Sequence, residues 1–120
     1  MANRYFFQYQ NSYERELVYM HGQIQINASN AVTSNNIVGL ASAARTGAGQ
    51  YTLVFTDSFH GGLKSATFTV QAAAAIDRVV QIRSWTPATK TLVIEELAGA
   101  VATDAGAAHA IHCDIAFINI

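Results

Sequence analysis

The chain has few of the features that restrain a small protein covalently. Its 120 residues include one cysteine, Cys113, and one proline, Pro87. A single cysteine excludes an intrachain disulfide, so the fold must be held together by burial of apolar surface. A chain of this size can bury roughly two thirds of its unfolded surface, which is sufficient for one domain. We therefore expect one self-supporting domain rather than two.

Charged residues are also scarce. They make up 12% of the chain, against an average of about 25%. The seven Lys and Arg residues are scattered and the net charge is -1, so no basic patch is available to neutralise phosphates. We expect no direct contact with nucleic acid. Much of the surface must instead consist of Ala, Ser, Thr, Asn and Gln, a composition that suits permanent contact with other subunits.

Long hydrophobic runs are missing as well. No run approaches the roughly 18 apolar residues that a membrane helix needs. The first residues, Met-Ala-Asn-Arg-Tyr-Phe-Phe-Gln, lack the hydrophobic region and the Ala-x-Ala cleavage site of a signal peptide. We expect no membrane association and no export by the secretory route.

The clearest folding signal lies at residues 45–55. The sequence Arg-Thr-Gly-Ala-Gly-Gln-Tyr-Thr-Leu-Val-Phe reads as the end of one strand, a glycine-framed turn and an alternating strand. Gly47 and Gly49 can both adopt the positive φ values that a hairpin loop of three or more residues demands. Turn chemistry and strand periodicity therefore agree on a β-hairpin.

Alternation of apolar and polar residues marks about seven half-buried strands in all. They are predicted near residues 16–27, 37–45, 51–55, 64–71, 78–85, 91–97 and 111–117. The stretches 27–36, 56–62 and 98–108 read as loops or turns, and the alanine run 72–75 reads as a connector. Because no helical pattern of ten or more residues is convincing, the sequence predicts an all-β domain, a single antiparallel β-sandwich or β-barrel.

Residues 1–15 differ from the rest and are predicted to form an extended N-terminal arm, with the β-domain spanning residues 16–120. The arm holds a cluster of aromatic side chains: Tyr5, Phe6, Phe7, Tyr9 and Tyr13. Two interpretations stay open, an edge strand folded onto the chain's own core or an arm lying on a neighbouring subunit. Stacking on nucleic acid would need more cations than Arg4 and Arg15 provide.

The cluster of potential metal ligands comprises His109, His112, Cys113 and Asp114. Successive residues of a strand point to opposite faces, so the spacing separates His109 from His112 and Cys113 from both of its neighbours. We expect no metal site and no cofactor. Cys113 is in phase with Ile115 and should be buried and inert. His109 is expected in a loop, and His112 on the polar face of the last strand.

Two further polar groups have the residue types of active sites without the required spacing. Glu95 and Glu96 are adjacent on a strand, so their side chains diverge and cannot form an acid/base dyad. We expect them on a solvated or intersubunit face. Asp57, Ser58 and His60 are sequence neighbours in a turn and lack the strand-turn-helix setting of a catalytic nucleophile. The sequence therefore predicts no catalytic residue.

Three stretches resemble small structural proteins of tailed bacteriophage virions. They are residues 45–59, which begin Arg-Thr-Gly-Ala-Gly-Gln-Tyr-Thr, the run Gln-Ala-Ala-Ala-Ala at 71–75, and Ala-Thr-Asp-Ala at 102–105. The resemblance extends over most of the chain, from the arm to the final strand. It implies a non-enzymatic virion component and brings no catalytic residues with it.

The resemblance also implies a particular role, that of a capsid decoration, or cement, protein. Such a protein would assemble in the host cytoplasm, lie on the capsid surface, and bind the major capsid protein and other copies of itself as a homotrimer. The aromatic residues at positions 5, 6, 7 and 9 would anchor these contacts. Many copies with modest interfaces would together resist the internal pressure of the genome.

Two alternatives remain open. A head-fibre or tail-tip module would recognise a host glycan or protein through Arg83 and Trp85, which are expected on one strand face, and through the loop around His60. A small metal-dependent hydrolase would act through His109, His112 or Asp114.

Overall fold

The computed structural model describes residues 17–59 and 62–118. Within these ranges the chain forms nine strands and one short 3-10 helix, and no α-helix. The elements are β1 (Leu17–Ile26), β2 (Val32–Asn35), β3 (Leu40–Gly47), β4 (Gln50–Phe55), β5 (Gly62–Ala72), β6 (Val79–Thr86), η1 (Pro87–Thr89), β7 (Thr91–Ala98), β8 (Val101–Ala102) and β9 (His109–Ile118).

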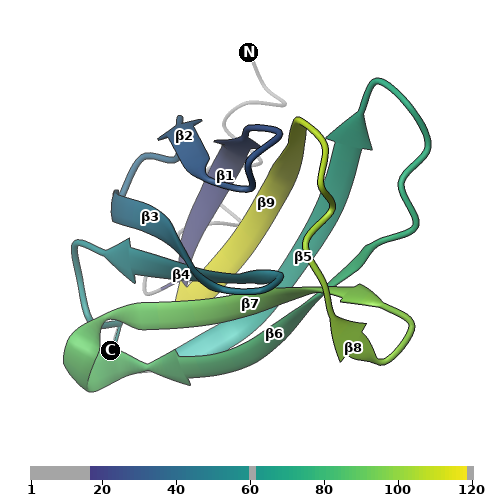
Figure 1. The fold of residues 1–120 in the computed structure, drawn as a ribbon. Coiled ribbons are helices and arrows are strands. Elements are labelled where there is room, and N and C mark those ends of the chain that lie inside the picture. The colour runs from purple at the N-terminus through teal and green to yellow at the C-terminus, as the bar shows by residue number, and fades with distance from the viewer. Residues whose placement is uncertain (1–16, 60–61, 119–120) are drawn as a thin grey trace, which may run out of the picture.

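Two antiparallel sheets pack face to face (Figure 1). Sheet A has the strand order β2-β1-β9-β5, and sheet B has the order β3-β4-β7-β6 with β8 paired to the end of β7. The predicted all-β sandwich is therefore confirmed, whereas the barrel alternative is wrong because the sheets do not close. The structure has about nine strands rather than seven. The additional strands, β2 and β8, have four and two residues, too few to show an alternating pattern.

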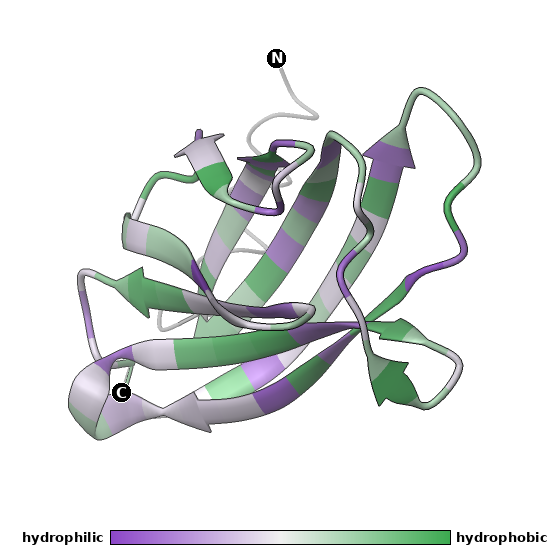
Figure 2. Cartoon of the chain, viewed as in Figure 1, coloured by the Kyte–Doolittle hydropathy of each residue, from purple (hydrophilic) through white to green (hydrophobic). Residues whose placement is uncertain are grey.

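Side chains from the facing sides of both sheets form one core. Figure 2 shows how apolar and polar residues alternate along β5 and β9, as expected for strands with one buried face. Each fully buried large apolar side chain stabilises the fold by about 1.5–3 kcal/mol. The buried core residues are Met20, Ile24, Ile26, Ile37, Tyr51, Leu53, Phe55, Phe59, Leu92, Ile94, Ile111, Cys113, Ile115 and Phe117. Burial on this scale takes the place of a covalent framework.

The predicted hairpin is present as β3 and β4, with a tighter turn than expected. Gly47 pairs with Gln50, so the loop has two residues rather than three. Of the two glycines, Gly49 has a positive φ of 67° and Gly47 does not. A Cβ atom at Gly49 would lie 2.5 Å from the backbone nitrogen of Thr103. Gly49 is therefore required for close approach of another segment as well as for the turn.

Candidate functional site

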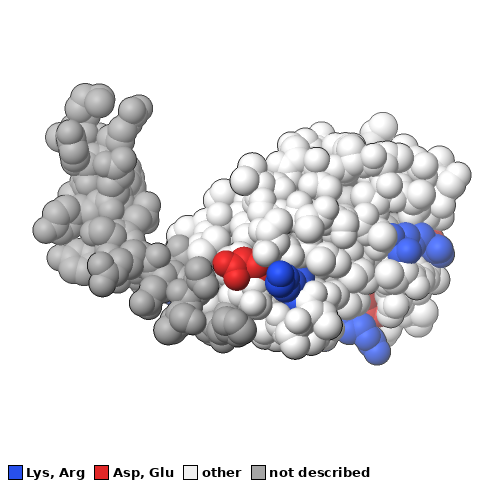
Figure 3. Space-filling model, turned by 90° about the vertical axis from the view of Figure 1, so that its left-hand side faces the viewer, with Lys and Arg blue, Asp and Glu red and all other residues white. Residues whose placement is uncertain are grey.

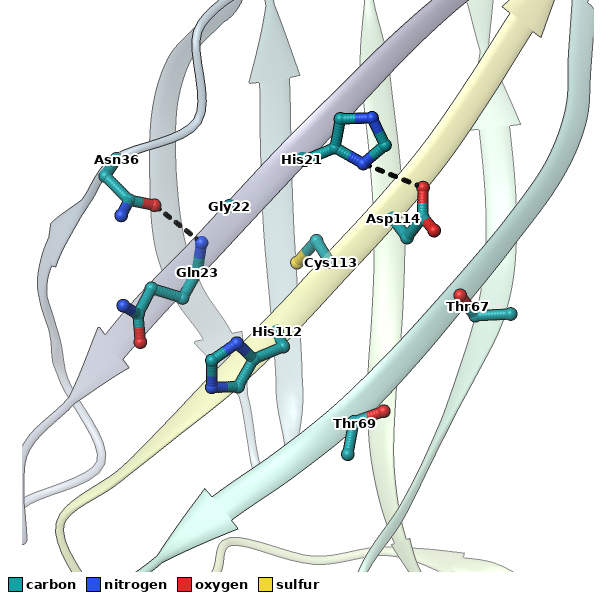
Figure 4. A pocket seen from close by; sticks show the side chains of 9 residues that line it. All are labelled: His21, Gly22, Gln23, Asn36, Thr67, Thr69, His112, Cys113 and Asp114. Carbon is teal, nitrogen blue, oxygen red and sulfur yellow. Dashed lines mark hydrogen bonds and ion pairs between the residues drawn. The ribbon is translucent and has the colours of Figure 1, made fainter. Parts of the chain in front are cut away.

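The outward side of sheet A carries a polar face built from β1, β9 and β5 (Figure 4). Alternate residues of these three strands point outward because their neighbours fill the core. A hollow of about 390 Å³ lies on this face. We call the following outward residues the polar face: Tyr19, His21, Gln23, Asn36, Thr67, Thr69, His112 and Asp114.

The hollow depends on a glycine in the middle of β1. A Cβ atom at Gly22 would lie 2.6 Å from Oδ1 of Asn36 and 2.7 Å from Cγ1 of Ile37, so a larger residue would displace both side chains. The backbone N–H of Gln23 donates to that same Asn36 oxygen at 2.7 Å. Figure 4 shows this bond at one side of the hollow. This hydrogen bond holds the Asn36 side chain in place at one side of the hollow.

An aromatic and ionic group stands beside the hollow. His21 Nδ1 lies 3.0 Å from Asp114 Oδ1, and the two side chains are 66% and 61% exposed. The ring of Tyr19 stacks on His21 at a centroid distance of 6.3 Å and an interplanar angle of 9°. A contact between polar side chains this exposed contributes about 0–1 kcal/mol to stability. Its groups can therefore be used for contact with a ligand or partner without loss of the fold.

The second histidine of the polar face confirms one expectation. His112 is exposed on β9, and its Nε2 bonds the Gln71 side chain. Its neighbour Cys113 points into the core, where burial raises the pKa of the thiol to about 12. The expectation of a buried, inert cysteine is also confirmed, because the nucleophilic thiolate does not form at such a pKa. Within the described residues, no three His, Cys, Asp or Glu side chains gather as a metal site.

A histidine–glutamate pair lies inside the sandwich. His109 Nε2 is 3.0 Å from the Glu96 carboxylate, and neither side chain is exposed. His109 Nδ1 is 2.7 Å from the carbonyl oxygen of Ala107, which can only accept, so Nδ1 carries a hydrogen. Nε2 and the carboxylate therefore share one proton. The expectations of a loop position for His109 and a solvated face for Glu96 are wrong.

Tyr51 lies beside this pair. Burial and the neighbouring Glu96 carboxylate raise the pKa of the Tyr51 hydroxyl above its usual range, so it stays protonated. Glu96, His109 and Tyr51 are all fully or almost fully buried. The residue types of a proton-transfer site are therefore present, with their side chains enclosed in the core.

A network of hydrogen bonds closes the sandwich next to the buried pair. Asp104 accepts from Arg45 Nε at 3.1 Å, from Arg45 Nη2 at 2.6 Å and from the Gly49 backbone at 2.8 Å. Arg78 donates to the carbonyl oxygens of Thr103 and Asp104. The Arg45 hydrogen bond holds the pKa of Asp104 below its usual range. We call Arg45, Gly49, Arg78, Thr103 and Asp104 the latch.

The sequence did not predict the contacts of the latch, although both segments that form it were noted. Segments from residues 45–59 and 102–105, which are far apart in the sequence, meet in it. Asp104 stands alone as a charge within the small-residue stretch 98–108, and this isolation was the available signal. Its partner could not be identified because Arg45 lies 59 positions away.

The expected recognition pair of Arg83 and Trp85 does not share a face. Trp85 packs into the core, with its ring centroid 4.7 Å from Phe117 and 5.8 Å from Phe55. Arg83 lies on the outer side of sheet B and bonds Glu95 at 3.2 Å. A β-bulge between Ile82 and Ser84 shifts the alternation between them, which the sequence pattern did not reveal.

Glu95 lies on the outer side of sheet B but is almost fully covered by polar neighbours, so the expectation of a solvated position is wrong. Hydrogen bonds from Gln50, Gln81 and Arg83 lower the pKa of its carboxyl group. The remaining predicted site residues, His60 and the aromatic residues of the arm at positions 5, 6, 7, 9 and 13, lie outside the described residues.

Comparisons with protein-family models, with curated proteins and with solved structures found no match to this chain. In the part of the chain that the structure describes, no helix has the length and apolarity to cross a membrane. The fold places the chain among antiparallel β-sandwich proteins, and its sheet A has a polar outer face.

Proposed function

We propose that this protein is a non-enzymatic structural component of a tailed-phage virion, acting as a decoration protein that binds the lattice of the major capsid protein. The supporting observation is the low charge of its surface. Charged groups neutralise one another in two outward pairs, Arg45–Asp104 and Arg83–Glu95, and Asp114 lies against the His21 ring. On the face drawn in Figure 3, charged atoms are few and scattered. Depletion of charge is typical of the cores of protein interfaces.

The fold suits this role in a second way. At the end where His109 and Glu96 are buried, the latch ties the β3–β4 hairpin to Asp104, and these bonds restrain the outer surface there. Rigid surfaces lose little conformational freedom on binding, so each contact of a decoration protein keeps more of its binding energy. Copies held at many sites on one capsid would add their effects. The location on the capsid surface and a homotrimer in the capsid-bound state follow from the resemblance and remain part of the proposal.

A binding assay tests the proposal. The full-length protein should co-sediment with capsids of its phage that lack it, up to a fixed number of copies. Replacing Tyr5, Phe6, Phe7 and Tyr9 by Ala should abolish co-sedimentation without lowering the melting temperature. The matched control is Tyr19→Ala, which removes an exposed tyrosine outside the arm and should bind normally. No saturable binding by the wild type overturns the decoration role, and normal binding by the arm variant overturns the arm as anchor.

The polar face favours a second candidate, a head-fibre or tail-tip module that binds a host glycan. An exposed aromatic ring beside carboxylate, imidazole and amide groups can stack on one side of a sugar and bond its hydroxyls. Tyr19, Asp114, His21 and Gln23 supply these groups at or next to the hollow. On a glycan array this candidate requires saturable binding that Tyr19→Ala abolishes. Loss of capsid binding in the arm variant with no glycan binding would favour the decoration role.

A further inference from the structure

The four outer edges of the two sheets differ in how well they are protected. Among the described strands, β2 and β5 are the edges of sheet A, and β3 and β6 are the edges of sheet B. Edge strands expose backbone groups that can pair with another chain, and short length or bulges discourage such pairing. β2 has four residues, β3 has two register shifts, and β6 has one in its middle. Three edges are therefore interrupted or short.

The edge of β5 has no such protection. β5 has 11 residues, and its register shift lies at its start, between Leu63 and Ser65. From Ser65 to Ala72 it pairs regularly with β9, and this stretch contains neither a charge nor a proline. Figure 1 shows β5 as the outermost strand beside β9. We call residues 65–72 the β5 edge.

The core side of the β5 edge is incompletely covered. Phe68 and Val70 face the core but are only half-buried, whereas their partners across the ladder, Cys113 and Ile111, are buried. The outward row consists of four exposed neutral residues. They are Ser65, Thr67, Thr69 and Gln71. A strand added here would bury apolar surface and satisfy backbone groups together.

We propose that the β5 edge pairs with the β5 edge of a second copy, antiparallel about a two-fold axis at Thr69. The two-fold axis must lie between the two copies of one residue. Only then do core-facing residues of one copy pair with core-facing residues of the other, because a register shift of one residue turns every side chain to the opposite face. At Thr69, the axis places Phe68 opposite Val70 of the second copy and Thr69 opposite its own counterpart. Aromatic–β-branched and Thr–Thr pairs are favoured cross-strand pairs.

Charge also favours a second copy as the occupant. Self-pairing of a charged strand would oppose like charges, which destabilises the ladder, but the β5 edge is neutral throughout. The same two-fold contact predicts a dimer, in contrast to the trimer that the resemblance implies. A contact between two eight-residue strands buries less surface than a stable protein interface, which buries about 1,600 Å². We therefore expect the fraction of dimer to rise with protein concentration. The proposal of this dimer does not rest on the proposed capsid role.

The mass of the full-length protein in solution tests this contact. Light scattering over a concentration series should show a rise from the 12.9 kDa monomer to twice that mass. Thr69→Lys opposes two ammonium groups at the axis and should remain monomeric at every concentration. Ser42→Lys places the same charge on the exposed, bulged edge β3 and should dimerise like the wild type. Because both positions are exposed, circular dichroism should show unchanged folding.

Disulfide trapping tests the register. Opposed residues of an antiparallel pair lie about 4.5–5.5 Å apart at Cα, within the range that a disulfide spans. Oxidised Thr69→Cys should form a covalent dimer, while Thr67→Cys, which faces Gln71, should not. A wild type that stays monomeric overturns the proposal. So does an oligomer of any size that Thr69→Lys leaves intact, whether the arm or another surface holds it.

Discussion

The two ends of the sandwich interior are closed by opposite kinds of chemistry. The aromatic end consists of Phe55, Phe59, Trp85 and Phe117, and the polar end of Tyr51, Glu96 and His109. The strands β4, β7 and β9 run between both ends, so the same elements change from aromatic packing to a buried histidine–glutamate pair along their length. At the aromatic end, Phe59 stacks on Phe117 at 4.5 Å and 12°.

This difference in chemistry determines how much each end is destabilised by substitution. Ring packing has broad geometric minima and tolerates substitutions of similar volume. The polar end depends on the His109–Glu96 contact, because an unpaired charge or donor in the interior is costly, and Tyr51 Oη and Glu96 Oε2 already lack a hydrogen-bond partner among the described residues. The latch reinforces this end, since the Glu96 backbone bonds both Gly49 and Thr103. The aromatic end should therefore be tolerant and the polar end intolerant.

The largest effect is expected when one member of the buried pair is removed. Glu96→Ala leaves the His109 imidazole buried without its partner and should lower the free energy of unfolding by about 3–5 kcal/mol. Replacement of both residues by Leu removes both polar groups and should be much less harmful than Glu96→Ala alone. Urea denaturation of the three proteins measures this. A loss below about 1 kcal/mol for Glu96→Ala would contradict the importance of the pair.

The two ends also differ in how far the sequence predicts them. Alternation predicted the strands near residues 51–55 and 111–117 that carry Phe55 and Phe117, and it placed Cys113 in the core, because an apolar inner row has a period of two. It could not place Glu96 or His109, which continue the inner rows of β7 and β9 with polar residues. Their burial depends on a partner from another strand. Trp85 was misplaced because a bulge changes the period locally.

The polar face and the latch were likewise only partly predictable from the sequence. The sequence predicted that His112 is outward, but the meeting of His21 with Asp114 depends on the register of β1 against β9. Register is set by long-range pairing, and a local pattern does not contain it. The glycines at 22 and 49 were visible, yet the atoms that require them belong to Asn36 and Thr103.

The next largest effect tests whether the latch supports the polar end. Gly49→Ala puts a Cβ atom 2.5 Å from Thr103 N and 2.7 Å from Glu96 O, at a φ of 67°. The strained backbone alone costs about 1–3 kcal/mol, and the clash adds to it. Gly62→Ala is the matched control, because it also has a positive φ but its Cβ would meet nothing within 4 Å. Equal melting temperatures of the two variants would show that the latch contributes nothing.

A smaller effect is expected at the aromatic end. Trp85 Nε1 is buried and has no hydrogen-bond partner among the described residues. Trp85→Phe loses contact area but removes this unsatisfied donor, so the loss of stability should stay below about 1.5 kcal/mol. Thermal unfolding followed by circular dichroism measures it. A loss as large as that of Glu96→Ala would show that the aromatic end is no more tolerant than the polar end.

The smallest effect concerns the pH dependence of the latch. The Arg45 hydrogen bond lowers the pKa of Asp104 below its ordinary value of 3.8 in the folded protein. Its stabilising contribution is therefore complete above about pH 4 and is lost as the pH falls through the lowered pKa. Arg45 and Asp104 are partly exposed, so solvent and salt screen the pair and the contribution is small. Asp104→Asn should lower the melting temperature slightly at pH 7 and reduce its fall between pH 5 and pH 2. An unchanged acid profile would mean that the latch is held by its backbone hydrogen bonds and the Arg78 contacts, with no contribution from the Asp104 charge.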